Sequence, residues 1–262
     1  MIKTKSKLFK IISFCLSLLF WILVWAIAAY KTGNSFLLPS PKDTVLVFSE
    51  LASTLDFWRT VSISLGRILI GILISIVLGI LVAVASTSLV AADSLFSPLM
   101  TVIKATPIAS FIVLALLWMD KNTLPIFITI LIVLPIVVSN ICTGIRSTDK
   151  DLLEVAKVYR FSFGMRIRRI YIPSVMPYFL AACRASLGMA WKAGIAAEVL
   201  CTPKDAIGTK IYLSKTYLET TELFAWTLAV IIFSLIIEKL LILILNRLAG
   251  RLHVQKKEAD NA

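Results

Sequence analysis

Long runs of apolar residues, broken by short polar stretches, dominate the chain. Six runs have the length that crossing a bilayer requires, about 20 helical residues for a hydrocarbon core about 30 Å thick. They cover residues 11–30, 64–85, 95–119, 124–145, 175–199 and 223–245. The pattern predicts an all-α, polytopic membrane protein with six transmembrane helices. Because no repeat or low-complexity linker divides the chain, we expect residues 1–262 to form a single domain.

The first run is free of charged residues and follows four lysines, which is typical of a span whose N-terminus stays inside. A cleaved signal peptide is the alternative, because Ala26-Ile27-Ala28 has the small residues of a cleavage site. The run is longer and richer in tryptophan than a typical signal core. We therefore expect a retained first transmembrane helix.

One long polar segment, residues 146–177, separates the fourth and fifth runs and carries seven Lys or Arg side chains. Loops rich in these residues stay on the cytoplasmic side of a membrane. Thr148, with Asp151 three residues later, is typical of a helix N-cap. The helix behind it has one apolar face, because Leu152 is followed at helical spacing by Val155 or Ala156 and then by an aromatic residue. The segment is therefore predicted to form a short amphipathic helix.

Composition agrees with a membrane protein, and the charge bears mainly on topology. With 59% hydrophobic and 16% charged residues and a mean hydropathy of +0.92, the chain is more apolar than soluble domains are. The net charge of +12 does not indicate nucleic-acid binding, because the basic residues gather in loops beside apolar runs. Expected inner segments hold fifteen Lys or Arg and outer segments seven. We therefore predict cytoplasmic N- and C-termini.

Signatures of enzymes and metal sites are missing from the sequence. There is no phosphate-binding P-loop, so the chain cannot hydrolyse ATP by such a loop of its own. The HExxH zinc motif is absent, the four cysteines form no CxxC pair, and no histidine lies within an apolar run. We therefore expect no enzyme activity, no metal site and no cofactor in this chain.

Three cations inside apolar runs need a physical explanation: Lys104, Arg184 and Lys192. Each costs about 2.5–3.5 kcal/mol at the centre of a membrane helix, so we expect them to face protein or a water-filled path. Arg184 and Lys192 are eight residues apart on about the same helix face, with Gly188 between them. An anion crossing the membrane would be stabilised there. Pairing with Glu198 or with an interhelical carbonyl is the structural alternative, and Lys104 is also placed where it could snorkel.

Thr106-Pro107 interrupts the third run, because proline removes a backbone donor and bends a helix. Irregular backbone at membrane depth is tolerated only where protein or water satisfies it. The sequence leaves open whether this bend faces a pore or is a plain proline kink. Met189 and Trp191 in the fifth run are more typical of packing than of a gate.

The polar segment resembles the cytoplasmic loop of the permease subunits of bacterial ABC importers. The resemblance lies in Glu154-Val155-Ala156, where the family has Glu-Ala-Ala, and in Pro173 after the family's spacer. Arg160 occupies the family's glycine position, and Gly164 is the residue expected to supply a bend. In that family the loop, here 146–173, is the coupling helix that sits in a groove of the ATPase subunit. The resemblance implies coupling residues Leu152, Glu154, Val155, Ala156, Tyr159, Arg160, Phe161, Phe163 and Gly164. The alternative is a basic cytoplasmic loop that touches lipid, which would not need two spaced prolines or the three aromatic side chains, expected to be buried.

The resemblance covers about residues 38–245 and is greatest to the nitrate, sulfonate and taurine branch, through residues such as Leu38-Pro39-Ser40-Pro41 and Ala197-Glu198. It implies the type I ABC importer (MetI-like) permease fold, with a core at about 59–248. The expected pathway residues are Lys104, Thr106, Pro107, Arg184, Gly188, Trp191, Lys192 and Glu198.

The same resemblance implies the partners. They are a second permease copy in a homodimer, two ATPase subunits that hold ATP and Mg, an extracytoplasmic substrate-binding protein, and the bilayer of a bacterial cell membrane. The chain would form half of the pathway for a small, anionic solute of the nitrate, sulfonate or taurine kind. It departs from the branch at Trp118-Met119-Asp120, where Phe-Gly is usual, so the solute stays open.

Three alternatives follow from the same residues. The permease could carry a neutral or cationic nitrogenous or aromatic solute, such as a vitamin precursor. A self-sufficient secondary transporter is disfavoured, because the apolar runs lack an acidic residue at mid-depth that could couple protons. An intramembrane enzyme would need a catalytic constellation that the sequence does not contain.

Overall fold

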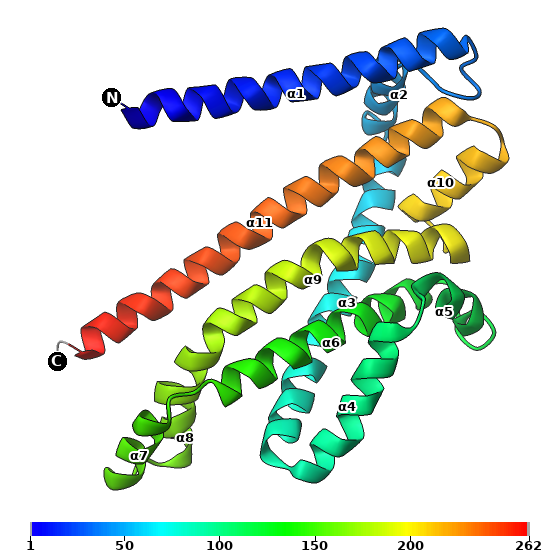
Figure 1. Ribbon diagram of the computed structural model, residues 1–262. Helices are drawn as coiled ribbons and strands as arrows, with labels where there is room; N and C mark the ends of the chain where they lie inside the picture. The colour runs from blue at the N-terminus through cyan, green and yellow to red at the C-terminus, as the bar shows by residue number, and fades with distance from the viewer. Residues whose placement is uncertain (1, 261–262) are drawn as a thin grey trace.

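The computed structural model describes residues 2–260, and within them the side chains of residues 9, 12–13, 15–244 and 247 (Figure 1). This part of the chain consists of helices joined by short loops and contains no strand. It therefore confirms the all-α class. In chain order the helices are α1 (Ile2–Thr32), α2 (Pro41–Ala52), α3 (Leu55–Ser88), α4 (Val90–Ala105), α5 (Ile108–Ala115), α6 (Leu124–Arg146), α7 (Lys150–Val158), α8 (Phe163–Arg166), a π-helical turn (Ile167–Tyr171), α9 (Ile172–Cys201), α10 (Ile207–Thr216) and α11 (Thr220–Asp260).

Four of the described helices are long and apolar enough to cross a membrane. These segments are Cys15–Thr32, Leu55–Ser88, Leu124–Arg146 and Thr220–Ile244. The bent pair α4 and α5 passes the same test as a fifth span. α9 has 30 residues, but its charged side chains reduce its apolar character. Length and composition therefore support up to five spans in the described chain, and the sixth stays a prediction.

The third predicted span, residues 95–119, consists of two helices. α4 begins at Val90, earlier than predicted, and continues through Pro98. Its continuation α5 leaves at an angle of 102° after a break at Thr106 and Pro107. The break lies where the proline predicted it. Thr106, the residue before Pro107, is extended with ψ of 126° and ends α4, because a following proline disfavours the helical conformation.

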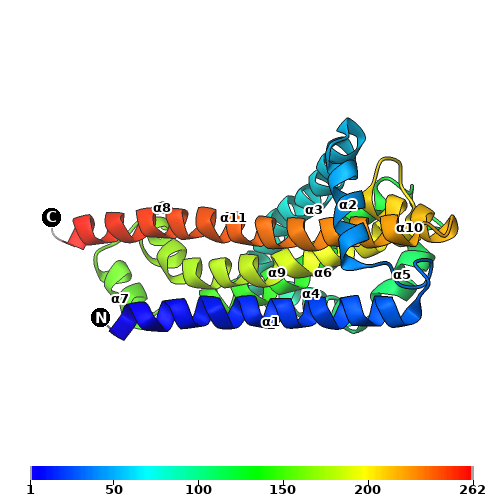
Figure 2. The same cartoon turned by 90° about the horizontal axis from the view of Figure 1, so that it is seen from above.

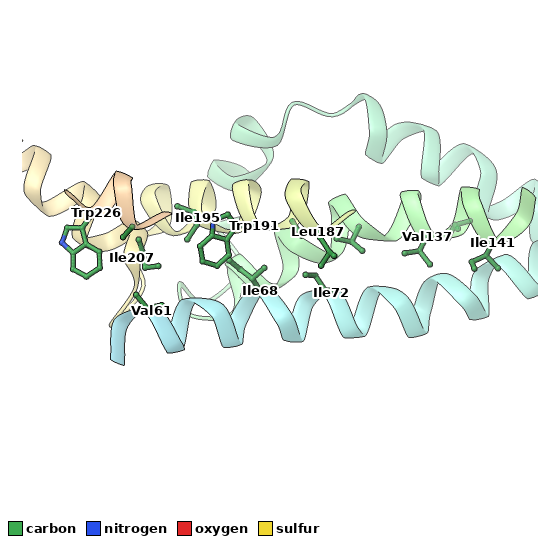
Figure 3. Packing of buried hydrophobic residues seen from close by; sticks show 14 of the residues in the cluster. Val61, Ile68, Ile72, Val137, Ile141, Leu187, Trp191, Ile195, Ile207 and Trp226 are labelled. Carbon is green, nitrogen blue, oxygen red and sulfur yellow. The ribbon is translucent and has the colours of Figure 1, made fainter. Parts of the chain in front are cut away.

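The core is built on α6, which packs most extensively against α3 and α9. Gly79 lets α3 and α6 approach closely, since a Cβ there would lie 2.6 Å from Val137 Cγ1. Gly194 does the same for α9 and α3 beside Ile68. Figure 3 shows Ile68, Leu187 and Trp191 meeting in the cluster that fills the space between these helices. Close backbone approach and side-chain packing therefore hold the three helices together.

An ion pair joins neighbouring helices at each end of the molecule. At one end Arg146 Nη2 lies 3.3 Å from Asp93 Oδ2, which ties the end of α6 to the start of α4. At the other end Lys210 Nζ lies 2.7 Å from Asp56 Oδ2, which ties α10 to the start of α3. The start of α1, the end of α11 and α7 all lie toward the same end, away from α5 and α10 (Figure 2). This arrangement puts both ends of the described chain, residues 2 and 260, on the side of the polar segment.

Candidate functional site

The polar segment forms a short helix, α7, whose cap differs from the predicted one. Asp149 is the N-cap, and its side chain accepts a hydrogen bond from Asp151 N at 2.9 Å. Thr148, the predicted cap, is buried and donates its hydroxyl to Gly144 O at 3.4 Å. Thr148 therefore completes the end of α6. Two consecutive capping residues made the sequence ambiguous by one position.

The bend after α7 lies at Arg160, and the expectation that Gly164 supplies it is wrong. Arg160 has a φ of +50°, in the left-handed region, whereas Gly164 lies within α8. Phe161 N donates to Ala156 O at 2.8 Å, and Arg160 N donates to Lys157 O at 3.1 Å. This pair of bonds is the Schellman motif, which ends a helix with one left-handed residue, most often glycine. Arg160 therefore adopts the backbone conformation that the family's glycine suggests.

Replacing Arg160 by glycine is expected to stabilise the end of α7 by about 1 kcal/mol. A side chain in the left-handed region costs about 1–2 kcal/mol, which glycine avoids. Part of this gain is offset, because glycine loses more conformational entropy on folding than arginine does. Thermal unfolding of the purified protein in detergent measures the change. Arg160→Val, with a branched side chain at the same φ, should destabilise instead. Equal melting temperatures for the two variants would contradict the left-handed conformation.

The apolar side chains of the segment remain exposed in the single chain. Tyr159 and Phe163 are 73% and 76% exposed, and Leu152 and Val155 are each 48% exposed. Ala156 is buried. The expectation that the aromatic residues are buried is therefore wrong for Tyr159 and Phe163, while Phe161 is half-buried. An apolar surface of this kind on a protruding segment is typical of a site where another protein binds.

One face of α9 carries both of its predicted cations. Arg184 and Lys192 are exposed, with the partly exposed Gly188 between them. Met189 belongs to the same exposed face. Trp191, by contrast, is buried in the core (Figure 3). Its Nε1 donates to Val230 O at 3.1 Å. The structure therefore separates a charged face of α9 from a packed one.

Glu198, also expected on the pathway, lies in a buried polar junction at the end of α9. Its Oε2 accepts hydrogen bonds from Ser64 Oγ at 2.8 Å and from Gly208 N at 3.2 Å. Its Oε1 lies 3.7 Å from Arg67 Nη1. Glu198 thus forms an ion pair with Arg67 of α3, whereas the expected partners were Arg184 and Lys192.

Further contacts extend this junction to a third helix and a loop. Arg67 Nη2 donates to Lys204 O at 2.8 Å and to Asn122 Oδ1 at 3.2 Å. Ile207 N donates to Ser64 Oγ at 2.9 Å. The junction therefore joins α3, α9, α10 and the loop before α6. Sequence reasoning missed it, although Arg67 and Glu198 are opposite charges near the outer ends of two predicted spans, which is a usable signal.

The break between α4 and α5 opens into a pocket of about 420 Å³. Lys104 and Thr106, both predicted pathway residues, line it, and Pro107 is the exposed N-cap of α5. Met189 reaches the same pocket from the charged face of α9. Among the described residues, no three His, Cys, Asp or Glu side chains gather to hold a metal ion. The available chemistry is that of cations beside apolar walls.

Known proteins resemble this chain in sequence and in fold. It is 26% identical over 218 residues to the putative aliphatic sulfonates transport permease protein of Bacillus subtilis (strain 168), covering 82% of this chain and 77% of that protein. It is 34% identical over 104 residues to the nitrate import permease protein of Synechococcus elongatus, covering 39% of this chain and 37% of that protein. Both relatives are named as permeases, the membrane components of transport systems.

A solved structure supports the fold over nearly the whole chain. The crystal structure of a bacterial ABC transporter involved in the import of the acidic polysaccharide alginate has a TM-score of 0.59 at 17% identity. The likeness covers 95% of this chain and 98% of that one. Residues 75–254 match the family described as the binding-protein-dependent transport system inner membrane component. The chain therefore belongs to this family of ABC importer permeases, in the branch of the nitrate, sulfonate and taurine permeases.

Proposed function

We propose that two copies of this chain form the membrane core of an ABC importer that carries a small anion, delivered by an extracytoplasmic substrate-binding protein. The observation that supports an anionic solute is the exposed face of α9, which holds Arg184 and Lys192. If α9 is the predicted fifth transmembrane helix, two cations on it need a polar path, because lipid does not stabilise them. The relatives named for aliphatic sulfonates and nitrate transport anions as well.

The segment around α7 is the proposed contact with the ATPase subunit, which holds the ATP and Mg²⁺. Its exposed apolar side chains, above all Tyr159 and Phe163, offer an anchor, and the charged side chains between them set the register. Both termini lie toward the end of the molecule that carries α7 (Figure 2). Together with the excess of basic residues in these segments, this supports cytoplasmic termini in the bacterial plasma membrane.

Neutralising both cations, as Arg184→Gln with Lys192→Gln, is expected to lower uptake about 100-fold. A hydrogen bond to a charged group contributes about 1.5–3 kcal/mol, and each 1.4 kcal/mol is a factor of about ten. The measurement is ATP-driven uptake of radiolabelled alkanesulfonate or nitrate into proteoliposomes that contain the permease, its ATPase and its binding protein. Co-purification of the ATPase should be unchanged.

The matched control is Arg184→Lys with Lys192→Arg, which keeps both charges and should retain most uptake. Unchanged uptake in the neutral variant would remove the case for an anion and favour a neutral or cationic nitrogenous or aromatic solute. Ion-driven uptake by this chain alone would identify a secondary transporter instead. The first result would contradict the charge of the solute, and the second would contradict the need for an ATPase.

A further inference from the structure

The pocket at the break between α4 and α5 is lined mainly by apolar side chains and by one lysine. Its volume of about 420 Å³ falls within the range of small-molecule sites. Apolar side chains from four helices, α4, α5, α6 and α9, make up most of its walls. The lining residues are Leu99, Val102, Ile103, Lys104, Thr106, Ile108, Phe111, Ile128, Leu131, Ile132, Pro135, Ile136 and Met189.

Lys104 is the one charged side chain among the described residues that line the pocket. It lies in the last turn of α4, and its side chain is exposed. The hydroxyl of Thr106 is already engaged, because Oγ1 donates to Val102 O at 2.8 Å. The pocket therefore offers a single strong polar contact at one place and hydrocarbon elsewhere.

The backbone at the break argues against lipid as the occupant. The 102° bend at Thr106 and Pro107 interrupts the helical hydrogen bonds. Interrupted backbone does not face lipid within the hydrocarbon region, but it can face protein or a water-filled cavity. Met189 also joins the pocket to the face of α9 that carries Arg184 and Lys192. The pocket therefore adjoins the proposed anion path.

The single lysine and the apolar walls of the pocket together indicate which kind of anion it would bind. A strongly hydrated inorganic anion would lose water against these walls and gain one cation, which is an unfavourable exchange. An organic anion with an apolar body places its acid group at Lys104 and its body against residues such as Phe111 and Ile132. We propose that this pocket is a subsite for a monovalent organic anion with an apolar chain or ring, such as a hydrophobic sulfonate or carboxylate. The proposal rests on the proposed function as an anion importer.

Direct binding tests the pocket without the selectivity of the binding protein. The complex of permease and ATPase in nanodiscs is titrated calorimetrically with methanesulfonate, butanesulfonate, hexanesulfonate, nitrate and neutral hexanol. Affinity for the sulfonates should rise about fourfold for each added methylene that the walls bury. Lys104→Met should weaken hexanesulfonate binding about tenfold or more and leave hexanol unchanged. Lys104→Arg should keep the binding, and Lys121→Met, in the short turn before α6, is the matched control.

A second variant tests the apolar wall. Ile132→Trp adds volume inside the pocket, so it should weaken hexanesulfonate binding and leave methanesulfonate nearly unaffected. Thermal unfolding shows that each variant is folded before it is titrated. Equal binding of hexanesulfonate and hexanol, indifferent to Lys104→Met, would identify a lipid-chain groove and overturn the proposal. Tighter binding of nitrate than of hexanesulfonate would overturn it too.

Failure of this inference is distinguishable from failure of the proposed function. If Arg184→Gln with Lys192→Gln abolishes anion uptake while Lys104→Met and Ile132→Trp bind every sulfonate as the wild type does, the importer stands and the pocket is not a subsite. If the double variant transports normally, the proposed anion path is contradicted, whatever the pocket binds.

Discussion

Glu198→Ala is expected to lower the free energy of unfolding by about 3–5 kcal/mol. Removing one partner of a buried ion pair leaves the other charge uncompensated, which costs that much in other proteins. Here Arg67 loses its carboxylate, and Ser64 Oγ and Gly208 N lose their acceptor. The melting temperature in detergent should fall by about 10 °C, since each kcal/mol corresponds to about 2–4 °C in a chain of this size.

Two further variants separate the parts of this effect. Glu198→Gln keeps an oxygen for Ser64 and Gly208 but removes the charge, so it should be less destabilising than alanine. Glu50→Ala, at an exposed position in α2, is the control and should change the melting temperature little. A Glu198→Ala variant as stable as the wild type but unable to transport would support the predicted role of Glu198 in the translocation pathway.

Leu152→Glu with Val155→Glu is expected to abolish binding of the ATPase subunit. Both side chains are 48% exposed on α7, and a partner that covers them would enclose two new charges. A buried charge without a partner costs about 2–5 kcal/mol, so two of them should weaken the complex by at least about 100-fold. Co-purification of the ATPase with tagged permease from detergent measures the loss.

The control for this variant is Leu46→Glu in α2, which is 50% exposed and lies away from α7 (Figure 1). It should leave co-purification intact. The double variant should also melt at nearly the wild-type temperature, because exposed positions contribute little to stability. Normal recovery of the ATPase with the double variant would show that another surface binds it.

For the polar segment, local sequence patterns predicted the helix but not the residue at which the chain turns. Its position, short amphipathic helix and resemblance to the coupling loop were all readable, because a helical period and capping residues are properties of neighbouring residues. The residue that turns the chain was not. By residue type alone, arginine is a poor candidate for a left-handed conformation. Arg160 adopts one because the two Schellman hydrogen bonds, accepted by the carbonyl oxygens of Ala156 and Lys157, hold the backbone there.

The eight predicted pathway residues divide in a similar way. Lys104 and Thr106 line a pocket, while Arg184, Gly188 and Lys192 share the exposed face of α9. Their helical spacing and the cost of a charge in lipid were enough to select these positions. Trp191 and Glu198 were also expected on the pathway, but both are buried. For Trp191 the burial agrees with the packing role that the sequence favoured. Which neighbour a helix face meets depends on how α3, α10 and α11 pack, and this depends on contacts far apart in sequence.

By itself, the sequence determined the class of this protein, most of its spans, the break at Thr106 and Pro107, and the protruding helix, because each depends on apolar length, period or a local backbone constraint. The tertiary structure alone decided that Glu198 pairs with Arg67 and that Lys104 meets apolar walls from α6 and α9. These contacts join residues that are distant along the chain, so no local pattern encodes them. They arise when glycines such as Gly79 and Gly194 allow the helices to approach.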